Sequence, residues 1–550
     1  MSEIGSLLKE VIAKQKTFIV VTGGVCSSLG KGLLISSMGS LLKNSGYSVN
    51  VIKCDPYFNV DPGTMSPLVH GEVFVTDDGA ETDLDLGHYE RALGVHLSRE
   101  SSVSSGQIYQ SVLDGERKGK YLGRCIQIIP HVVDSIKERI LKFALSKDAE
   151  FILIEIGGTV GDMEADVFLE TIRQLKQDLG DHRLFHAHLS YVPLLSWLGE
   201  IKTKPTQHSV MMLKQAGLIP DGLFLRADRE IECKAVDKVS NLCGVGRDFV
   251  FQVLTHNPIY NLFIDLYGQQ IHKKLQKWFG IKDVKDSDMS EWQELVDRIM
   301  KEKKRVKIGM VVKYIGGNDT YVSVVQAVKS AAHHRDRSVD IIYIDSEKLE
   351  RNDPKALEQL KTVAGIIVPG GFDERGIEGK VLAAKWAREN NVPYLGLCLG
   401  MQILLIEFAR HVVGFEDASS SEFSDTTSHP VIVPLEEQVD IKEMGGSMRL
   451  GAYPCTIVEG TRASKIYGEN EVMERHRHRY EFNTKYTDDF VKSGAVFSGI
   501  YKEKGLVEIT ELNDHKFMIG CQFHPEFLST PLKPHPLFKA FMDAALEGED

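Results

Sequence analysis

Short apolar runs alternate with helical patterns along this chain, and that alternation constrains the fold more than any other sequence feature. The runs end at or near Gly, Asp or Pro, as strands buried on both faces of a sheet do. Parallel strands joined by crossover helices produce this order of elements. In the first half we predict strands at 18–22, 49–53, 151–156, 184–192, 223–225 and 249–254, with helices at 33–44 and 130–144.

The alternation stops at a charge-dense stretch, 282–307, and then starts again. A helix is predicted there at 290–304, because five apolar residues form one narrow stripe: Trp292, Leu295, Val296, Ile299 and Met300. Further strands are predicted at 306–312, 339–344, 365–368 and 392–397. A chain of 550 residues exceeds what one core usually supports. We therefore predict an α/β domain at 1–281, a linker at 282–305 and a second α/β domain at 306–550.

Two segments do not follow the alternation. Residues 1–16 mix Lys and Glu with apolar residues at helical spacing, which predicts a short amphipathic helix. Residues 416–446 are rich in Ser, Thr, Asp and Glu without a clear period, which favours a surface insertion or long loop.

Charge and cysteine usage narrow the class of protein. The formal net charge of -12 argues against a nucleic-acid partner, although local basic pockets for phosphates remain compatible with it. No apolar run approaches the ~18 residues of a membrane span, so we expect no membrane partner. The eight cysteines lack metal-ligand spacing, and no secretory leader is evident. We expect free thiols in a soluble cytoplasmic enzyme.

A cysteine lies between a predicted strand and a predicted helix in the second domain. The strand covers 392–397 and the helix 401–410, so Cys398 occupies the sharp turn between them. Gly396 and Gly400, two residues to either side, permit that turn. The partial positive charge at the helix start favours a thiolate. The pattern predicts a nucleophile exposed at the sheet edge.

Backbone N–H groups near this cysteine can stabilise an oxyanion. The N–H of Leu399 faces the position where that charge would develop, and a second donor is available from the loop 369–372. In that loop Gly371 has no side chain, so its backbone can approach a substrate closely. Losing one such donor typically costs ~100-fold to ~1000-fold in rate.

A histidine and a glutamate follow the last predicted strand, 517–523. In extended backbone His524 and Glu526 project to the same side, so Glu526 is expected to orient His524 as a general base. A lone buried Cys is usually inert packing and a lone His-Pro-Glu is usually a loop. Because both lie at strand ends of one α/β domain, each supports the functional interpretation of the other.

A phosphate-loop-like stretch, 23–32, lies between the first strand and the first crossover helix. It departs from the standard pattern twice: Val25 stands where the first Gly is expected, and Gly32 replaces the hydroxyl residue. Backbone N–H groups of 27–32 can still cradle phosphates, with Lys31 reaching their charge. The hydroxyl residue of a standard phosphate loop binds Mg²⁺. Since no hydroxyl follows Lys31, carboxylates must supply more of the metal ligands.

Three carboxylates are candidates for that metal site. Asp83 and Asp85 lie close together in sequence, and Glu155 ends the strand 151–156. Hard oxygen ligands beside a triphosphate suit Mg²⁺, which is the cofactor that we expect.

Residues 306–540 closely resemble the class I glutamine amidotransferases, on the glycine-flanked Cys398, the Pro-Gly-Gly loop and the His-Pro-Glu ending. The resemblance implies that Cys398 attacks the glutamine carboxamide, forms a glutamyl thioester and releases ammonia while His524 moves the protons. It also implies that glutamine is held by Gly371, Leu399, Gly400, Met401, Gln402, Glu422 and Arg479. Arg479 belongs to a basic run, 475–480, whose other interpretation is a solvated surface.

A second resemblance covers nearly the whole chain, 17–540. The stretches that carry it are 23–32, 53–57, 59–67, 71–91 and 202–207, and they are similar to those of the CTP synthase family. The resemblance implies two doubly wound domains, a P-loop-like synthetase domain and a flavodoxin-like amidotransferase domain. It further implies that ATP phosphorylates the 4-oxygen of UTP and that ammonia displaces the phosphate to give CTP.

The same resemblance assigns nucleotide contacts position by position. For ATP these are Ser28, Leu29, Gly30, Lys31, Gly32, Leu33, Lys53 and Asp85, and for Mg²⁺ they are Asp85 and Glu155. For UTP, and for CTP as feedback inhibitor, they are Ser27, Asp162, Met163, Glu164, Lys202, Thr203, Lys204, Pro205, Thr206, Gln207 and Lys238. Lysines and hydroxyls in 202–207 suit a triphosphate; an exposed linker loop is the alternative. Residues 253–256 depart from the family pattern where adenine is expected.

The resemblance also implies ammonia transfer along a sealed route. His70 is a candidate for its mouth, with a structural histidine as the alternative. GTP is implied as an activator, and UTP- or CTP-promoted homotetramers are implied to stack into filaments.

Two other functions stay open at this point. One is an ATP-dependent amidotransferase that acts on a carboxylate substrate such as that of a corrin ring, and the other is a non-catalytic filament scaffold.

Overall fold

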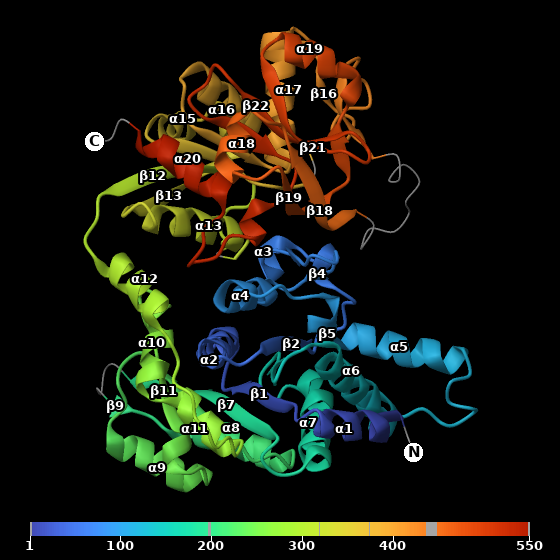
Figure 1. Ribbon diagram of the computed structural model, residues 1–550, viewed down its shortest axis with the longest axis vertical. Coiled ribbons are helices and arrows are strands. Elements are labelled where there is room, and N and C mark those ends of the chain that lie inside the picture. Colours follow the sequence, from blue (N-terminus) through green and yellow to red (C-terminus); the bar gives the residue numbers. More distant parts are fainter. Residues whose placement is uncertain (1–2, 196–199, 318, 373, 436–447, 548–550) are drawn as a thin grey trace. The chain divides into compact units, whose positions relative to one another are not determined.

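The computed structural model describes residues 3–195, 200–317, 319–372, 374–435 and 448–547, and it divides into two compact units (Figure 1). The first unit comprises Met1–Asp61 and His88–Met300, and the second comprises Pro62–Gly87 and Lys301–Asp550. The segment Pro62–Gly87 therefore packs with the second half of the chain, although it follows the second strand of the first half.

The first unit is built on a parallel sheet of seven strands in the described residues, in the order β11-β10-β7-β1-β6-β2-β5. These strands are rich in β-branched and other apolar residues, and both of their faces are buried. Their bounds are β1 Thr17–Gly24, β2 Val49–Asp55, β5 Ser102–Ser104, β6 Phe151–Ile156, β7 Leu184–Tyr191, β10 Gly222–Ala227 and β11 Val250–Leu254.

Helices cover both faces of this sheet (Figure 1). On β6, Ile152 and Ile154 pack with the helices α1, α6 and α7, whereas Leu153 faces Gly39 of α2 on the other side. The bounds are α1 Glu3–Ala13, α2 Lys31–Asn44, α4 Leu84–Leu93, α5 Ser105–Arg117, α6 Val133–Ser146, α7 Asp166–Leu179, α8 Lys204–Gln215, α9 Cys233–Cys243, α10 Asn261–Gly268, α11 Ile271–Trp278 and α12 Ser290–Met300.

The second unit is built on a mixed sheet of nine strands in the described residues, in the order β13-β12-β14-β15-β23-β22-β21-β18-β19. The first five are parallel, and the last four pair antiparallel. The bounds are β12 Arg305–Val312, β13 Ser338–Asp345, β14 Gly365–Val368, β15 Tyr394–Leu397, β18 Arg449–Ile457, β19 Glu471–His478, β21 Ala495–Tyr501, β22 Leu506–Leu512 and β23 Met518–Cys521.

Two separate apolar cores lie on the two faces of this sheet. Alternate residues of β14 show it, since Ile366 and Val368 join one core and Ile367 joins the other. The helices are α13 Val322–His333, α14 Ser346–Glu350, α15 Pro354–Lys361, α16 Ile377–Glu389, α17 Leu399–Phe408, α18 Arg462–Tyr467, α19 Thr487–Lys492 and α20 Pro536–Leu546. The fold class predicted from the sequence, two wound α/β domains, is confirmed.

Small sheets complete the architecture. The segment Pro62–Gly87 holds α3 Pro67–His70 and a hairpin of β3 Phe74–Val75 and β4 Glu81–Thr82. In the first unit β8 Leu194–Leu195 pairs with β9 Glu200–Ile201. In the second, β16 Ser419–Ser420, β17 Pro430–Pro434 and β20 Tyr480–Phe482 form a sheet of their own.

The structure corrects the predicted loop at 416–446. Its described part contains β16 and β17, and Ser419, Ser420, Val431 and Ile432 are buried. β16 consists of two serines and gives no apolar signal, whereas β17 is a short apolar run, Val431–Val433 between two prolines, inside a stretch that is otherwise rich in polar residues. Residues 436–446 of the prediction lie outside the described residues.

The predicted helices at both ends of the first half are present. α1 confirms the amphipathic helix of 1–16, and α12 confirms the helix within 290–304, although α12 ends at Met300. On α12, Trp292 is buried and stacks on Phe263 of α10 at 4.5 Å between ring centroids. The predicted stripe is therefore packed at Trp292, Leu295 and Val296, while Met300 is exposed. All eight cysteines are free, and no helix among the described residues is long and apolar enough to cross a membrane.

Candidate active site

Cys398 lies on a strained turn between β15 and α17. Its φ of 52° and ψ of -103° are unusual for a residue with a side chain. The flanking glycines are required by close approach: a Cβ on Gly396 would lie 2.4 Å from the carbonyl oxygen of Gly400, and one on Gly400 would lie 2.0 Å from that of Val368. The turn is therefore a nucleophile elbow, as the sequence predicts.

The thiol itself is buried rather than exposed at the sheet edge, which corrects the sequence prediction. Its Sγ lies 3.8 Å from the carbonyl oxygen of Arg477 and 3.6 Å from Nε2 of Gln522. Leu399 and Gly400 begin α17, and the first N–H groups of a helix have no partner inside it. Substrate must reach Cys398 through a pocket.

His524 and Glu526 form the predicted pair. Nδ1 of His524 lies 2.7 Å from Oε1 of Glu526, so the carboxylate fixes the ring and leaves Nε2 for proton exchange. The backbone differs from the extended form assumed from the sequence, because β23 ends at Cys521 and a 3-10 turn covers Pro525–Phe527. Burial acts to lower the His524 pKa, but Glu526 and Cys398 outweigh it and raise the pKa to about 10.

A pocket of about 180 Å³ in the second unit joins these groups. Its lining includes Gly371, Cys398, Arg477, His524 and Glu526. A Cβ on Gly371 would meet only ordinary contacts at 3.5 Å or more, so no neighbour in the described protein demands glycine there. The free space beside Gly371 is therefore available to a substrate.

One wall of this pocket comes from the segment Pro62–Gly87, which the sequence interpretation did not connect with the cysteine. Gly63, Met65, Pro67, Glu72 and Val73 line the pocket. Lining residues from two distant stretches of sequence make this a composite site within one compact unit.

Ion pairs attach that segment to the second sheet. Nε of Arg475 lies 2.6 Å from Asp77, and Nε of Arg477 lies 2.9 Å from Glu81. The backbone N–H of Ser323 donates to Glu72 at 2.9 Å. Part of the basic run thus pairs with carboxylates instead of facing solvent. Charge complementarity between 72–81 and 475–479 was the signal in the sequence that could have found this contact.

The phosphate-loop-like stretch of the first unit lies between β1 and α2. Val25, Ser28 and Gly30 all have positive φ, at 83°, 56° and 97°. Val25 adopts the conformation that the missing glycine would have taken, at a steric cost for a β-branched residue. Lys31 is the first residue of α2 and donates from Nζ to the carbonyl oxygen of Gly158. The loop therefore presents a lysine at a helix N-terminus, which suits phosphate.

The predicted metal ligands are placed in different units. Glu155 is buried at the end of β6, where it accepts a hydrogen bond of 2.6 Å from Tyr89. Asp85 lies in the first turn of α4 and groups with the second unit. No group of three or more His, Cys, Asp or Glu side chains in the described residues has the arrangement of a metal site. Mg²⁺ needs only one or two carboxylates when phosphates and waters supply the rest, so a single carboxylate such as Glu155 fits that mode of binding.

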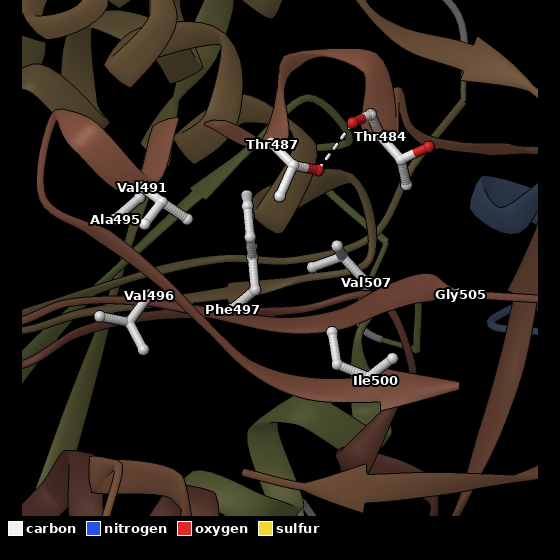
Figure 2. A pocket seen from close by; sticks show the side chains of 9 residues that line it. All are labelled: Thr484, Thr487, Val491, Ala495, Val496, Phe497, Ile500, Gly505 and Val507. Atoms are coloured by element: carbon white, nitrogen blue, oxygen red, sulfur yellow. Dashed lines mark hydrogen bonds between the residues drawn. The ribbon is translucent and has the colours of Figure 1, made fainter. Parts of the chain in front are cut away.

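A second, unrelated pocket of about 460 Å³ lies over α19, β21 and β22. Figure 2 shows Val491, Phe497 and Ile500 around it, and the hydroxyl of Thr487 donates to the carbonyl oxygen of Thr484 at 2.7 Å. Its described lining contains no acid–base side chain, in contrast to the pocket of Cys398.

Comparisons with known proteins identify the family to which both parts of the chain are similar. Residues 17–281 match the family model described as CTP synthase N-terminus, and residues 318–544 match that of glutamine amidotransferase class-I. The CTP synthase of Synechococcus sp. (strain WH7803) is 49% identical over 528 residues, which cover 96% of this chain and 97% of that protein. The CTP synthase of Chloroflexus aurantiacus is 51% identical over 530 residues, which cover 96% of each.

The chain belongs to the CTP synthase family. It has the synthetase domain and the glutamine amidotransferase domain of that family, in this order, and it is a glutamine-hydrolysing ligase. Among solved structures, the glutaminase domain of Trypanosoma brucei CTPS with bound acivicin is 43% identical, covers 44% of this chain and 94% of its own, and has a TM-score of 0.42. The two full-length relatives, from Synechococcus and Chloroflexus, favour a CTP synthase over an enzyme that amidates a carboxylate.

The glutamine contacts expected of a CTP synthase are only partly gathered at the pocket. Of the seven expected contacts, the described lining contains Gly371 alone and lacks Leu399, Gly400, Met401, Gln402, Glu422 and Arg479. Gln402 is buried and donates from Nε2 to Tyr480 and Gln522. The charges of Glu422 and Arg479 both influence Tyr480. Burial and Glu422 raise the Tyr480 pKa, whereas Arg479 lowers it. Leu399, Gly400 and Met401 are buried at the start of α17.

The expected UTP contacts of the family lie in the first unit. The run 202–207 is not a plain linker loop, because its last four residues begin α8. Lys202 pairs with Glu200, and the buried hydroxyl of Thr206 bonds Ser190 at 3.0 Å. The remaining expected contacts, Ser27, Asp162, Met163, Glu164 and Lys238, are exposed.

Proposed function

We propose that Cys398, His524 and Glu526 are the catalytic residues with which this CTP synthase releases ammonia from glutamine. The single observation that carries the proposal is the hydrogen-bonded His524–Glu526 pair in the same pocket as a cysteine held at positive φ. A thiol and an imidazole oriented by a carboxylate, lining one pocket, are the groups that an activated cysteine nucleophile needs.

The chemistry follows from the placement of these groups. Sγ of Cys398 bonds to the amide carbon of glutamine, and the electron pair of the C=O moves to oxygen. N–H groups of Gly371 and Leu399 stabilise that oxyanion. His524 gives a proton to the nitrogen, which leaves as ammonia, and a thioester remains on Sγ. Water, losing a proton to His524, then hydrolyses the thioester to glutamate and free thiol.

Glutamine is held next to the nucleophile by residues of α17 and of three segments outside it. We assign this role to Gly371, Leu399, Gly400, Met401, Gln402, Glu422 and Arg479. Since both N–H groups of the Gln402 amide are engaged with protein, its carbonyl oxygen is the group that remains to accept from the ligand.

We propose that ATP and UTP react at residues of the synthetase domain, 1–281. We assign ATP to the loop Ser28–Leu33 with Lys53, and UTP or inhibitory CTP to Ser27, 162–164, 202–207 and Lys238. The start of α8 and the two lysines beside it favour a triphosphate. Asp85 and Glu155 would hold Mg²⁺, which neutralises phosphate charge when bound. ATP phosphorylates the 4-oxygen of UTP, and ammonia then displaces phosphate to give CTP.

Regulation and assembly follow the family. We propose GTP as activator, CTP as feedback inhibitor, a homotetramer that stacks into filaments, and a cytoplasmic location that suits eight free thiols. Ammonia would pass from glutamine to UTP without release, which keeps it unprotonated. We assign 1–281 to the synthetase domain, 282–305 to the linker and 306–550 to the amidotransferase domain, although Pro62–Gly87 of the first range packs with the second compact unit.

The test replaces the nucleophile. Cys398→Ala should abolish CTP formation from UTP, ATP and glutamine, while formation from ammonium chloride persists within about twofold, because only the nitrogen source is lost. Cys455→Ala, a change of another buried thiol, is the control and should retain both activities. Loss of the ammonium-dependent reaction in folded Cys398→Ala protein would refute the division of labour.

A further inference from the structure

Gln522 is a fully buried side chain that contacts the nucleophile. It follows β23, and its backbone N–H donates to the carbonyl oxygen of Glu508 at 2.9 Å. Its Nε2 lies 3.6 Å from Sγ of Cys398, within the distance of a hydrogen bond to sulfur. The side chain therefore reaches a reacting atom from a rigid position.

The orientation of this amide is fixed by a chain of hydrogen bonds. The carbonyl oxygen of Tyr480 can only accept, so the atom of Gln402 that lies 3.0 Å from it must be the NH₂ group. The same NH₂ group lies 3.3 Å from Oε1 of Gln522. With its oxygen occupied by Gln402, Gln522 must turn its own NH₂ group toward Cys398.

The surroundings of Sγ show why such a donor matters. Burial disfavours a thiolate, and the carbonyl oxygen of Arg477, 3.8 Å away, suits a thiol proton but repels a negative charge. The groups that oppose these effects are the start of α17 and the imidazole of His524, which Glu526 supports. The guanidinium of Arg477 pairs with Glu81 instead.

We propose that Gln522 is a further catalytic residue of the glutaminase reaction: its amide N–H donates to Sγ, stabilises the thiolate and aims it into the pocket, with Gln402 as the positioning residue that sets the amide. The proposal rests on the proposed role of Cys398 as nucleophile. It makes Gln402 a residue with two roles, since it contacts glutamine in the proposed function and orients Gln522 at the same time.

The test measures the thiolate directly. In the full chain, the rate of Cys398 carboxamidomethylation by iodoacetamide is followed by peptide mass between pH 5.5 and 9.5, without glutamine. Gln522→Glu keeps the shape but replaces the donor by a carboxylate, and Gln522→Leu removes the donor without adding charge. Gln293→Glu, an exposed position on α12, controls for added charge. CTP formation from ammonium chloride reports folding.

The proposal predicts that both Gln522 variants shift the alkylation midpoint to higher pH by about one unit, with Gln522→Glu shifted further. Glutamine-dependent CTP formation should fall about tenfold to hundredfold, the range for a hydrogen bond to a charged group, while the ammonium-dependent reaction is kept. Should a Gln522 variant fail to fold, Gln402→Met is tested in its place. This change releases the Gln522 amide from its hydrogen bond, and the alkylation midpoint of Cys398 should rise by a smaller amount.

Two outcomes would overturn the proposal, and they are distinguishable. If Cys398 of the unaltered chain is not alkylated, the nucleophile itself is wrong and the role of Gln522 falls with it. If Cys398 reacts normally and folded Gln522→Glu and Gln522→Leu keep the unaltered midpoint, Gln522 only fills space and the nucleophile assignment stands.

Discussion

Val25 and Cys398 both hold a positive φ at the start of a functional turn. Such conformations cost roughly 1–3 kcal/mol each and persist only where the surroundings fix them. Val25 lies in the loop that precedes Lys31. At Cys398 the strained backbone directs a thiol into the pocket and leaves the following N–H groups free to face a substrate.

Lys31 is predicted to serve the synthetase reaction alone. Lys31→Ala should lower CTP formation at least a hundredfold with glutamine and with ammonium chloride alike, because the phosphate charge loses its partner in both cases. Glutamate release from glutamine should remain measurable. Lys14→Ala, an exposed position in the turn that follows α1, is the control. Normal CTP output from Lys31→Ala would contradict the phosphate assignment.

Glu526 is predicted to act through His524. Glu526→Gln removes the carboxylate that keeps the His524 pKa raised to about 10, so the pKa should fall toward its ordinary value near 6.5. We expect glutamine-dependent CTP formation to fall about a hundredfold, with ammonium-dependent formation kept, in a steady-state assay. Equal rates with glutamine in both proteins would show that the pair is structural.

At the scale of elements, the attachment of Pro62–Gly87 to the second sheet is the feature with the greatest consequence. Arg477 connects this segment with the active site in three ways. Its guanidinium pairs with Glu81, the residue lines the pocket, and its backbone carbonyl oxygen lies beside Sγ of Cys398. A change in this segment is therefore expected to alter the surroundings of the Cys398 thiol.

The Glu81–Arg477 pair is predicted to support glutamine use. Glu81 is 2% exposed and Arg477 14% exposed, so breaking the pair leaves a poorly solvated charge and costs about 3 kcal/mol. Glu81→Gln should lower the ratio of glutamine-dependent to ammonium-dependent CTP formation about tenfold, measured at saturating UTP and ATP. Asp514→Asn, an exposed carboxylate of the same unit, should leave the ratio unchanged. An unchanged ratio in Glu81→Gln would separate the segment from catalysis.

The first unit is predicted to lose stability in acid, because it contains buried histidines. Thr22 bonds His186 and His188 at 2.8 and 2.9 Å, and burial, with Lys31, lowers the His188 pKa to about 3. Since the folded-state pKa lies below the unfolded value near 6.5, the contribution to stability is present above pH 6.5 and is lost as pH falls toward 3. The slope is about 1.4 kcal/mol per pH unit.

The measurement is the free energy of unfolding in urea at pH 7.5 and 5.0. The unaltered chain should lose about 2 kcal/mol through His188 between pH 6.5 and 5, and His188→Gln should lose correspondingly less. His208→Gln, at an exposed position, should behave like the unaltered chain. An identical pH dependence in His188→Gln and the unaltered chain would show that His188 does not titrate on unfolding.

The sequence predicted the elements that build each site more accurately than the contacts that complete it. The strands that precede Lys31 and Cys398 are apolar runs with local signals, so their positions agree with β1 and β15 within two residues at either end. The His524–Glu526 contact was also predictable, because side chains only two positions apart in sequence have few possible arrangements. Glu72 and Gln522 were missed, since their contacts to Ser323 and Cys398 join residues 251 and 124 positions apart.

At the scale of the whole molecule, two α/β units each carry one half of a reaction that neither completes alone. The first has a loop suited to triphosphates, and the second has a pocket suited to an amide. A thiol nucleophile cannot activate the 4-oxygen of a pyrimidine, and a phosphate loop cannot release ammonia. In a CTP synthase the two chemistries are joined, because nitrogen passes from glutamine to the nucleotide.

That transfer can be followed with glutamine labelled with ¹⁵N at its amide, in the presence of UTP, ATP, magnesium chloride and an equal concentration of unlabelled ammonium chloride. The mass of the CTP formed measures which nitrogen entered the ring. The account predicts that most CTP carries ¹⁵N and that Cys398→Ala yields only unlabelled CTP. Unlabelled CTP from the unaltered enzyme, with glutamine left intact, would contradict it.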